Sequence, residues 1–185
     1  EVPWNATFSF QDMNEDETLD LFYYLDDNIT PSYKIRQADD TWDKAIPFSI
    51  GFLPSSFVIG DADGDGDKDL FCTDVKNQVF FSFRNQSNTG FNSIHLEQAD
   101  IPINGQLSGG DFNQDGQFDL LHSEFRRVPD GKLAWLERTN AGWQSHPIDT
   151  QQYYQPFLFP EDIDQDGDLD IVASSGVNGI NFYRN

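Results

Sequence analysis

A nine-residue pattern of oxygen-bearing side chains at alternate positions recurs four times along the chain. Three copies are strong, at 61–69, 111–119 and 162–170, and a weaker copy occupies 12–20. The first residues of successive copies are 49, 50 and 51 positions apart. A spacing this regular is typical of a structural repeat in which each unit builds the same supersecondary element.

Each copy has Asp or Asn at positions 1, 3, 5 and 9, and a backbone carbonyl is available at position 7. Oxygens spaced in this way can converge on one hard cation that takes six to eight oxygen ligands. His and Cys are absent from all four copies, which argues against zinc and copper, and magnesium would require a stricter octahedron with several retained waters. We therefore predict Ca²⁺, with three strong sites and a possible fourth. The side-chain ligands expected in the strong copies are Asp61, Asp63, Asp65, Asp69, Asp111, Asn113, Asp115, Asp119, Asp162, Asp164, Asp166 and Asp170, and those of the weaker copy are Asp12, Asn14, Asp16 and Asp20.

Position 6 distinguishes the strong copies from the weak one. Glycine there allows the tight turn around the ion, because glycine alone enters left-handed conformations cheaply. The strong copies have Gly66, Gly116 and Gly167 at this position, whereas the weak copy has Glu17. A non-glycine residue in that conformation costs about 1 kcal/mol, so we expect the site at 12–20 to be weaker or empty.

The EF-hand calcium loop begins in the same way but requires a bidentate Glu at position 12 and a helix on each side. Position 12 is Cys72, His122 and Ala173 in the three strong copies, and none of these side chains can complete such a site. An apolar, β-prone run follows each copy. The pattern therefore predicts a loop between two strands.

A charge run is usually only a solvated acidic surface, and the distribution of charge tests that alternative. The four nine-residue windows contain 18 of the 32 acidic residues and one of the 11 basic residues. Nearly all the excess negative charge therefore lies inside the loops. Aspartates two residues apart repel one another unless a cation neutralises them, which favours a metal site.

Composition limits the remaining classes of fold and function. A hydrophobic fraction of 37% with 15% aromatic residues is sufficient for a core. The single cysteine, Cys72, excludes an intrachain disulfide and is expected to be a small buried apolar residue. No apolar stretch approaches the roughly 20 residues needed to span a bilayer. The net charge of −21 opposes binding to nucleic acid and to anionic lipid surfaces.

The loops favour an extracellular or cell-surface location, because calcium outside cells reaches levels that fill even weak sites. Three glycosylation sequons, at Asn5, Asn28 and Asn85, are compatible with that location.

Hydrophobic alternation and turn residues predict four short strands per repeat, with one calcium loop between the first and second strands. The expected strands are 6–11, 19–25, 32–36 and 42–48 in the first repeat, 56–60, 70–74, 78–84 and 91–97 in the second, and 105–110, 119–125, 132–138 and 143–148 in the third. Four strands in a repeat of this size are typical of one propeller blade. We therefore predict an all-β chain, a β-propeller of four-stranded antiparallel blades.

Several segments resemble the VCBS or FG-GAP repeat, the calcium-loop blade of integrin α-chain propellers and of many secreted bacterial proteins. The resemblance rests on 63–70 followed by 79–85 and 89–91, and on 138–143 and 182–185. It covers essentially the whole chain, and VCBS-like is the closer description because the Gly-Ala-Pro element of FG-GAP is missing. The resemblance implies that Thr18, Asp67, Gln117 and Asp168 supply the position-7 carbonyls to the metal.

The resemblance also implies blades at about 1–52, 53–103, 104–155 and 156–185, the last without its outer strand. Propellers of this family usually close with more blades than four. The chain is therefore expected to close as an unusually small ring, to be a propeller fragment, or to associate with further copies or blades that complete the propeller.

Three functions compete on this sequence. The first is a non-catalytic recognition or adhesion module for a protein or glycan ligand, because bound cations pre-organise the loops. Exposed aromatic residues would suit a glycan, although aromatic residues in blades are more often core. The candidates are Trp4, Trp42, Trp135, Trp143, Tyr153 and Tyr154.

The second function is an accessory domain of a polysaccharide-degrading enzyme, and the third is a structural spacer in a large surface protein. No catalytic motif is present, so we expect the chain itself not to be an enzyme. His122 with Glu124, His95 and His146 are the nearest to acid–base groups, and a surface His beside an acid is the commoner explanation of such a pair.

Overall fold

In the computed structural model of the 185-residue chain, the described residues are 6–14, 16–25, 30–48, 50, 52, 54, 56–61, 64–74, 79–85, 91–95, 106–123, 133–149, 157–175 and 179–185. Side chains are not described for 79–85, 91–95, Ala6, Leu25, Asp74 and Ser175. Within these ranges the regular secondary structure is entirely β, which confirms the predicted all-β class.

The strands form four antiparallel sheets, and each sheet follows the order of the sequence. The first contains β1 (Ala6–Gln11), β2 (Asp20–Leu25), β3 (Ser32–Lys34) and β4 (Ile46–Pro47). The second contains β5 (Ser56–Gly60), β6 (Asp69–Asp74), β7 (Val79–Asn85) and β8 (Phe91–His95). The third contains β9 (Leu107–Gly110), β10 (Asp119–Ser123), β11 (Leu133–Thr139) and β12 (Gly142–Asp149). The fourth contains β13 (Phe157–Glu161), β14 (Asp170–Ser175) and β15 (Gly179–Tyr183).

The predicted strand 42–48 is present only in part. Trp42 forms an isolated bridge with Arg36 and the amide of Asp43 donates to the carbonyl of Ile35, but regular pairing resumes only at Ile46–Pro47. The turn 37–41 is fixed by the carboxylate of Asp39, which accepts from the Thr41 amide and hydroxyl at 3.1 and 2.6 Å. Only Ile46–Pro47 pairs as β4, because this local turn already satisfies the neighbouring backbone.

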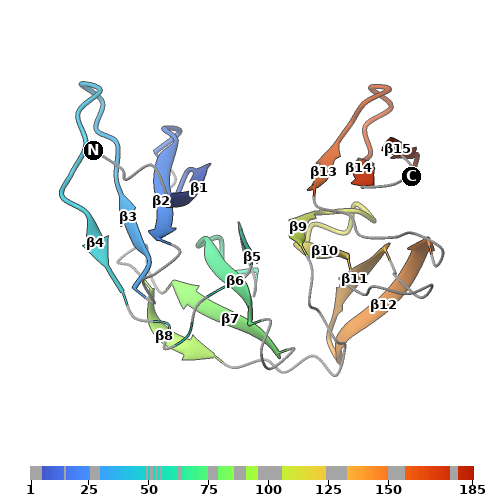
Figure 1. Cartoon of the computed structure of the whole chain (residues 1–185), viewed down its shortest axis with the longest axis horizontal. Helices are drawn as coiled ribbons and strands as arrows, with labels where there is room; N and C mark the ends of the chain where they lie inside the picture. Colours follow the sequence, from blue (N-terminus) through green and yellow to red (C-terminus); the bar gives the residue numbers. More distant parts are fainter. Residues whose placement is uncertain are drawn as a thin grey trace.

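The sheets follow one another along an open arc, with the first and the last sheets at its two ends (Figure 1). Inner strands of neighbouring sheets are in contact, since β9 contacts β5 on one side and β13 on the other. One hydrogen bond runs directly between inner strands, from the amide of Leu107 to the hydroxyl of the buried Ser56 at 2.9 Å.

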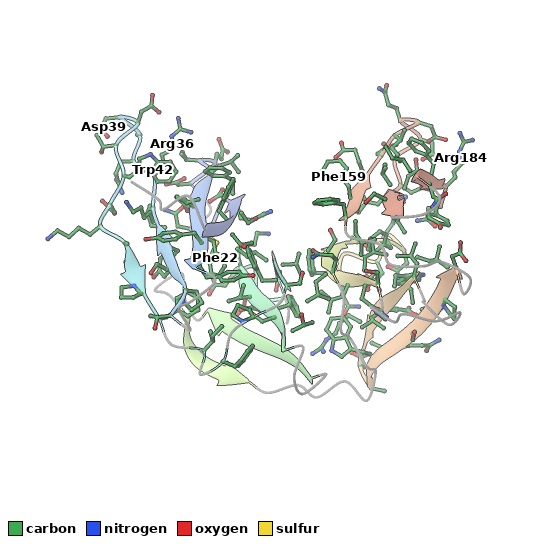
Figure 2. All side chains as sticks on the ribbon, viewed as in Figure 1. Phe22, Arg36, Asp39, Trp42, Phe159 and Arg184 are labelled. Atoms are coloured by element: carbon green, nitrogen blue, oxygen red, sulfur yellow. The ribbon has the colours of Figure 1, made fainter. Side chains whose placement is uncertain are left out.

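Three hydrophobic clusters lie between successive sheets and hold the arc together. Phe22 of β2 packs against Phe57 of β5 at a centroid separation of 4.5 Å, within the cluster between the first two sheets (Figure 2). Phe71 stacks on Phe118 at 5.7 Å in the second cluster. Leu121 and Ile171 belong to the third, between the last two sheets. Every cluster is built by two repeats, so no sheet buries its apolar residues alone.

Cys72 lies on β6 and is fully buried, as predicted, and burial raises the pKa of its thiol. The thiol is therefore protonated at neutral pH and serves as a small apolar core residue.

Candidate metal centres

Each nine-residue loop connects the first and second strands of its sheet, which is the position predicted from the sequence. The loops are 12–20, 61–69, 111–119 and 162–170, and each ends on the first residue of the second strand. The four loops are therefore equivalent elements of the repeat, with equivalent positions on the backbone.

The position-1 aspartate organises each loop by accepting backbone amides with both carboxylate oxygens. In the third loop, Asp111 Oδ1 accepts from the Asp115 amide at 3.0 Å, and Asp111 Oδ2 accepts from the Gly116 amide at 2.8 Å. Asp12 and Asp162 accept the amides of positions 5 and 6 in the same way. Asp61 accepts from Gly64 and Gly66 at 2.7 and 2.9 Å. The pattern wraps the backbone around one carboxylate.

The position-5 aspartate continues this wrapping, because its Oδ1 accepts the amide of position 7. The distances are 2.9 Å for Asp16, 2.9 Å for Asp65, 2.8 Å for Asp115 and 3.3 Å for Asp166. Each of these bonds holds one oxygen of the position-5 carboxylate against the backbone of its own loop.

The position-9 aspartate is buried and ties the loop to the third strand. Asp119 accepts from the Phe112 amide at 3.2 Å and from the Arg138 amide at 2.8 Å. Asp20 and Asp170 make equivalent pairs of bonds, to the amide of position 2 and to the amide of Arg36 or Asn185, each two residues beyond the third strand of its sheet. The four position-9 carboxylates are between 0% and 3% exposed. The sequence identified these residues as ligands but gave no sign of this structural role.

Burial and crowding perturb the pKa of several loop carboxyls. Burial is the main cause that raises the pKa of Asp119 to about 6, against two backbone hydrogen bonds that lower it, and the charges of Asp115 and Asp111 raise it further. Burial raises the pKa of Asp20 in the same way. The pKa of Asp168 is raised by burial and then by Asp166, Asp170 and Asp164. A cation among these groups would relieve the repulsion that raises these values.

The fourth loop brings three carboxylates together. One oxygen from each of Asp162, Asp164 and Asp166 lies within 4.8 Å of the others. The first and third loops have Asn14 and Asn113 at position 3, and Asp63 of the second loop lies outside the described residues. In the fourth loop, Asp168 Oδ1 is a buried acceptor without a hydrogen bond. The donor set is oxygen throughout, so these residues fit a hard cation such as Ca²⁺.

Hydrogen-bond donors of the protein already contact acidic oxygens of the first, third and fourth loops. Arg184 Nε lies 3.0 Å from Asp164 Oδ2, at the open side of the fourth loop. In the third loop, the amide of Asn113 donates to Asp115 Oδ2 and to Glu137 Oε1 at 3.2 and 3.3 Å. These donors occupy the lone pairs that a cation would use, so metal binding would require Arg184 and the Asn113 amide to turn away.

Left-handed backbone conformations occur at two positions of the loops. At position 6, Glu17 has φ 66° where the other loops have glycine at 83° to 100°. The conformation expected for Glu17 is therefore present. At position 4, Gln114 and Gln165 have φ 59° and 62°, and Gly64 has 78°. The sequence analysis missed position 4, because Gln gives no signal of such a conformation and only Gly64 hints at it.

Of the six aromatic residues considered for a glycan surface, three lie in the described part of the chain, and two of these three pack against cores. Trp135 and Trp143 pack against the third and second clusters. Trp42 is 41% exposed and lies with Arg36 and Asp39 at one tip of the first sheet (Figure 2). Trp4, Tyr153 and Tyr154 lie outside the described residues.

Of the histidines considered as acid–base groups, His122 and His146 have described side chains. The expectation of a surface position for His122 is wrong, because it is 1% exposed inside the third sheet. His146 stacks on Trp135 at 4.4 Å and bonds Glu137 at 2.7 Å, which explains it as a packed side chain. Glu124 lies outside the described residues, as does the side chain of His95.

The chain matches no protein-family model, and a search of curated proteins finds no match either. The resemblance to VCBS and FG-GAP repeats therefore stays a prediction from the residues. Within the described ranges, no helix has the length and hydrophobicity required to cross a membrane.

Proposed function

We propose that the chain is a non-catalytic, calcium-binding module of the β-propeller type, built from VCBS-like blades. The observation that carries this proposal is the common hydrogen-bond scaffold of the four loops. In each loop the position-1 and position-5 carboxylates accept backbone amides, which gathers acidic oxygens within one short loop. Carboxylates gathered in this way repel one another, and a bound cation relieves that repulsion.

The propeller arrangement is supported by the order of the strands and of the sheets. Each sheet is a sequential antiparallel meander, and its first strand lies on the inside of the arc (Figure 1). Radial repetition of such sheets is the propeller architecture. The last sheet has three strands in the described residues, in agreement with a fourth blade that ends without its outer strand.

The ligand is proposed to be a protein or a glycan that contacts the loop edges outside the cell. A hollow of about 250 Å³ lies between the second and third loops, lined by Asp61, Gly116, Gln117 and Arg138. This volume is below the roughly 300 Å³ at which small-molecule sites begin, so a surface contact suits the site better than an enclosed substrate. The packing of Trp135 and Trp143 in cores reduces the aromatic surface for a glycan and favours a protein ligand.

Isothermal titration calorimetry with Ca²⁺ tests the metal sites. We expect saturable binding, a loss of one site in Asp164→Ala, and unchanged binding in Asp43→Ala, which removes an exposed acid outside the loops. Each site filled only in the folded state adds about 2.7 kcal/mol of stability at a hundredfold excess over Kd, so a chelator should lower the Tm sharply. Loss of binding in Asp43→Ala as well as in Asp164→Ala would indicate diffuse counterion attraction instead of a site.

A glycan array and a protein pull-down, each with and without chelator, separate the remaining functions. Capture that requires calcium supports a recognition module. Polysaccharide turnover by the isolated chain would contradict the non-catalytic proposal, and an absence of any ligand would favour the structural spacer.

A further inference from the structure

The exposed large apolar side chains form two groups, one at each end of the arc. In the described part of the chain, all of them belong to the first or the last repeat. We call the group on the first repeat the back face: it consists of Phe8, Phe10 and Leu19, which are 47% to 57% exposed. The front face of the last sheet consists of Phe157, Phe159, Ile180 and Phe182, which are 59% to 72% exposed. Neither group is expected to remain in contact with water at such exposure.

The residues of the back face occupy repeat positions whose equivalents in the other repeats pack in the hydrophobic clusters. Phe8 lies four residues before its loop, and its equivalents Phe57, Leu107 and Leu158 all pack in the cluster formed with the preceding sheet. Because the first sheet has no preceding sheet in this chain, Phe8 stays exposed.

Leu19, at position 8 of the first loop, follows the same rule. Its equivalents Phe118 and Leu169 in the third and fourth loops reach back to the preceding sheet, whereas the second loop has Lys68 at this position. A Cβ placed on Gly60 or Gly110 of that sheet would lie 2.4 Å from Phe118 or Leu169, which shows how closely position 8 seats there.

The residues of the front face occupy repeat positions that, in the other sheets, pack against the following sheet. Phe182 lies opposite Val172 across β14 and β15, just as Trp135 lies opposite Leu121 in the third sheet. Trp135 packs in the cluster formed with the following sheet. Phe159 is equivalent to Val58, which packs against the cluster between the second and third sheets. Figure 2 shows Phe159 on the side of the last sheet that faces the open end of the arc.

Each internal interface therefore joins the front of one sheet to the back of the next. The front face of the last sheet and the back face of the first sheet have no such partner within the chain. We propose that two copies of this chain associate head to tail, with the front face of one copy on the back face of the other. The contact continues the three interfaces already present, and both halves belong to the same chain, so a second copy supplies the matching surface. The two faces lie at opposite ends of the arc (Figure 1), which leaves both open to another molecule.

Charge makes this association depend on calcium, and that dependence rests on the proposed function. The chain has a net charge of −21, and like-charged copies repel each other. Most of the excess lies in the four loops, so filled loops lower the repulsion while the apolar faces supply the attraction.

The residue before each loop gives a test of the register. The second and third sheets have Gly60 and Gly110 there, whereas the first sheet has Gln11 and the last has Glu161. In a head-to-tail contact Leu19 of one copy meets Glu161 of the other. Glu161→Gly should therefore let Leu19 seat as Leu169 does on Gly110, and it should tighten the association.

Sedimentation velocity of the full chain in calcium, over a range of concentrations, tests the proposal. The wild type should associate reversibly, and Phe8→Asp and Phe159→Asp should each raise the dissociation constant more than about tenfold, because a buried unpaired charge opposes the contact. Thr7→Asp adds the same charge at an exposed neighbour on the opposite side of β1 and should leave association unchanged.

The decisive measurement mixes the two Phe variants. The Phe8→Asp chain keeps its front face and the Phe159→Asp chain keeps its back face, so an equimolar mixture should form a heterodimer that grows no further. A wild type that stays monomeric at all concentrations while calorimetry shows calcium binding would overturn the association and leave the proposed function intact. Association of Phe8→Asp with itself would show that like faces meet, and would also overturn the head-to-tail contact.

Discussion

The first loop, 12–20, and the third loop, 111–119, have the same hydrogen-bond scaffold on different residues. In both, the position-1 carboxylate accepts the amides of positions 5 and 6, and the position-9 carboxylate accepts an amide in the third strand or two residues beyond it. Position 6 is Glu17 in one loop and Gly116 in the other, and both are left-handed. The aspartates therefore set the path of the backbone, and glycine only lowers its cost.

The two loops differ more in what lies beside them. Phe118 of the third loop stacks on Phe71 of the preceding sheet, whereas Leu19 of the first loop is exposed at the end of the arc. The third loop is thus supported on both flanks and the first on one. This difference predicts unequal metal affinity even where the local geometry is the same.

The largest effect is expected where the two loops agree. Asp119→Ala and Asp20→Ala each leave two backbone amides without their acceptor in a buried site, at about 1 to 3 kcal/mol for each amide. Urea unfolding in chelator should therefore show similar losses of several kcal/mol in both variants. A large loss in only one of them would contradict the common scaffold.

The next effect should separate the loops. In calcium, Asp115→Ala removes a site that contributes about 2.7 kcal/mol at a hundredfold excess over Kd, and Asp16→Ala should cost less because its site is weaker. Thermal unfolding with calcium and with chelator measures both. The difference between the two variants should disappear in chelator, and equal losses in calcium would contradict our ranking of the sites.

Several parts of this architecture were readable from residues, and others were not. The loop positions, the strand 56–60 and most of the predicted strand 119–125 follow from alternation and from the Asp pattern, because these signals are local. The break in the predicted strand 42–48 was not expected, since it depends on the Asp39 carboxylate, which binds the backbone and side chain of Thr41 in the preceding turn. The double role of Asp119 was also hidden, because its partner Arg138 is 19 residues away and depends on the fold.

A smaller effect should come from position 6 itself. Gly116→Ala should cost about 1 kcal/mol, because a residue with a side chain is strained at φ 83°. A Cβ at Gly116 would meet nothing within 4 Å, so this cost is conformational and not steric. Glu17→Gly should raise the free energy of unfolding by about 0.5 kcal/mol. This gain is smaller than the strain that the substitution relieves, because glycine also gives the unfolded chain more conformational freedom. If urea unfolding showed Glu17→Gly to be destabilising, Glu17 would have a role beyond filling the turn.

The smallest effect is the dependence of stability on pH, which should differ between the calcium-free and the calcium-bound protein. Burial raises the pKa of Asp119 in the folded chain to about 6 from its ordinary value of 3.8, so the folded state binds more protons than the unfolded state between these pH values. The stability that this group contributes without calcium is therefore present below about pH 4 and is lost as pH rises through 6. Calcium reverses the trend, because it binds the ionised carboxylate and competes with the proton.

Melting curves at pH 5 and pH 7 in chelator should show the higher Tm at pH 5, and Asp119→Asn should reduce that difference. A Tm in chelator that rises with pH in the wild type would mean that Asp119 is already ionised in the empty loop, and that the buried carboxylate is stabilised by its two backbone amides alone.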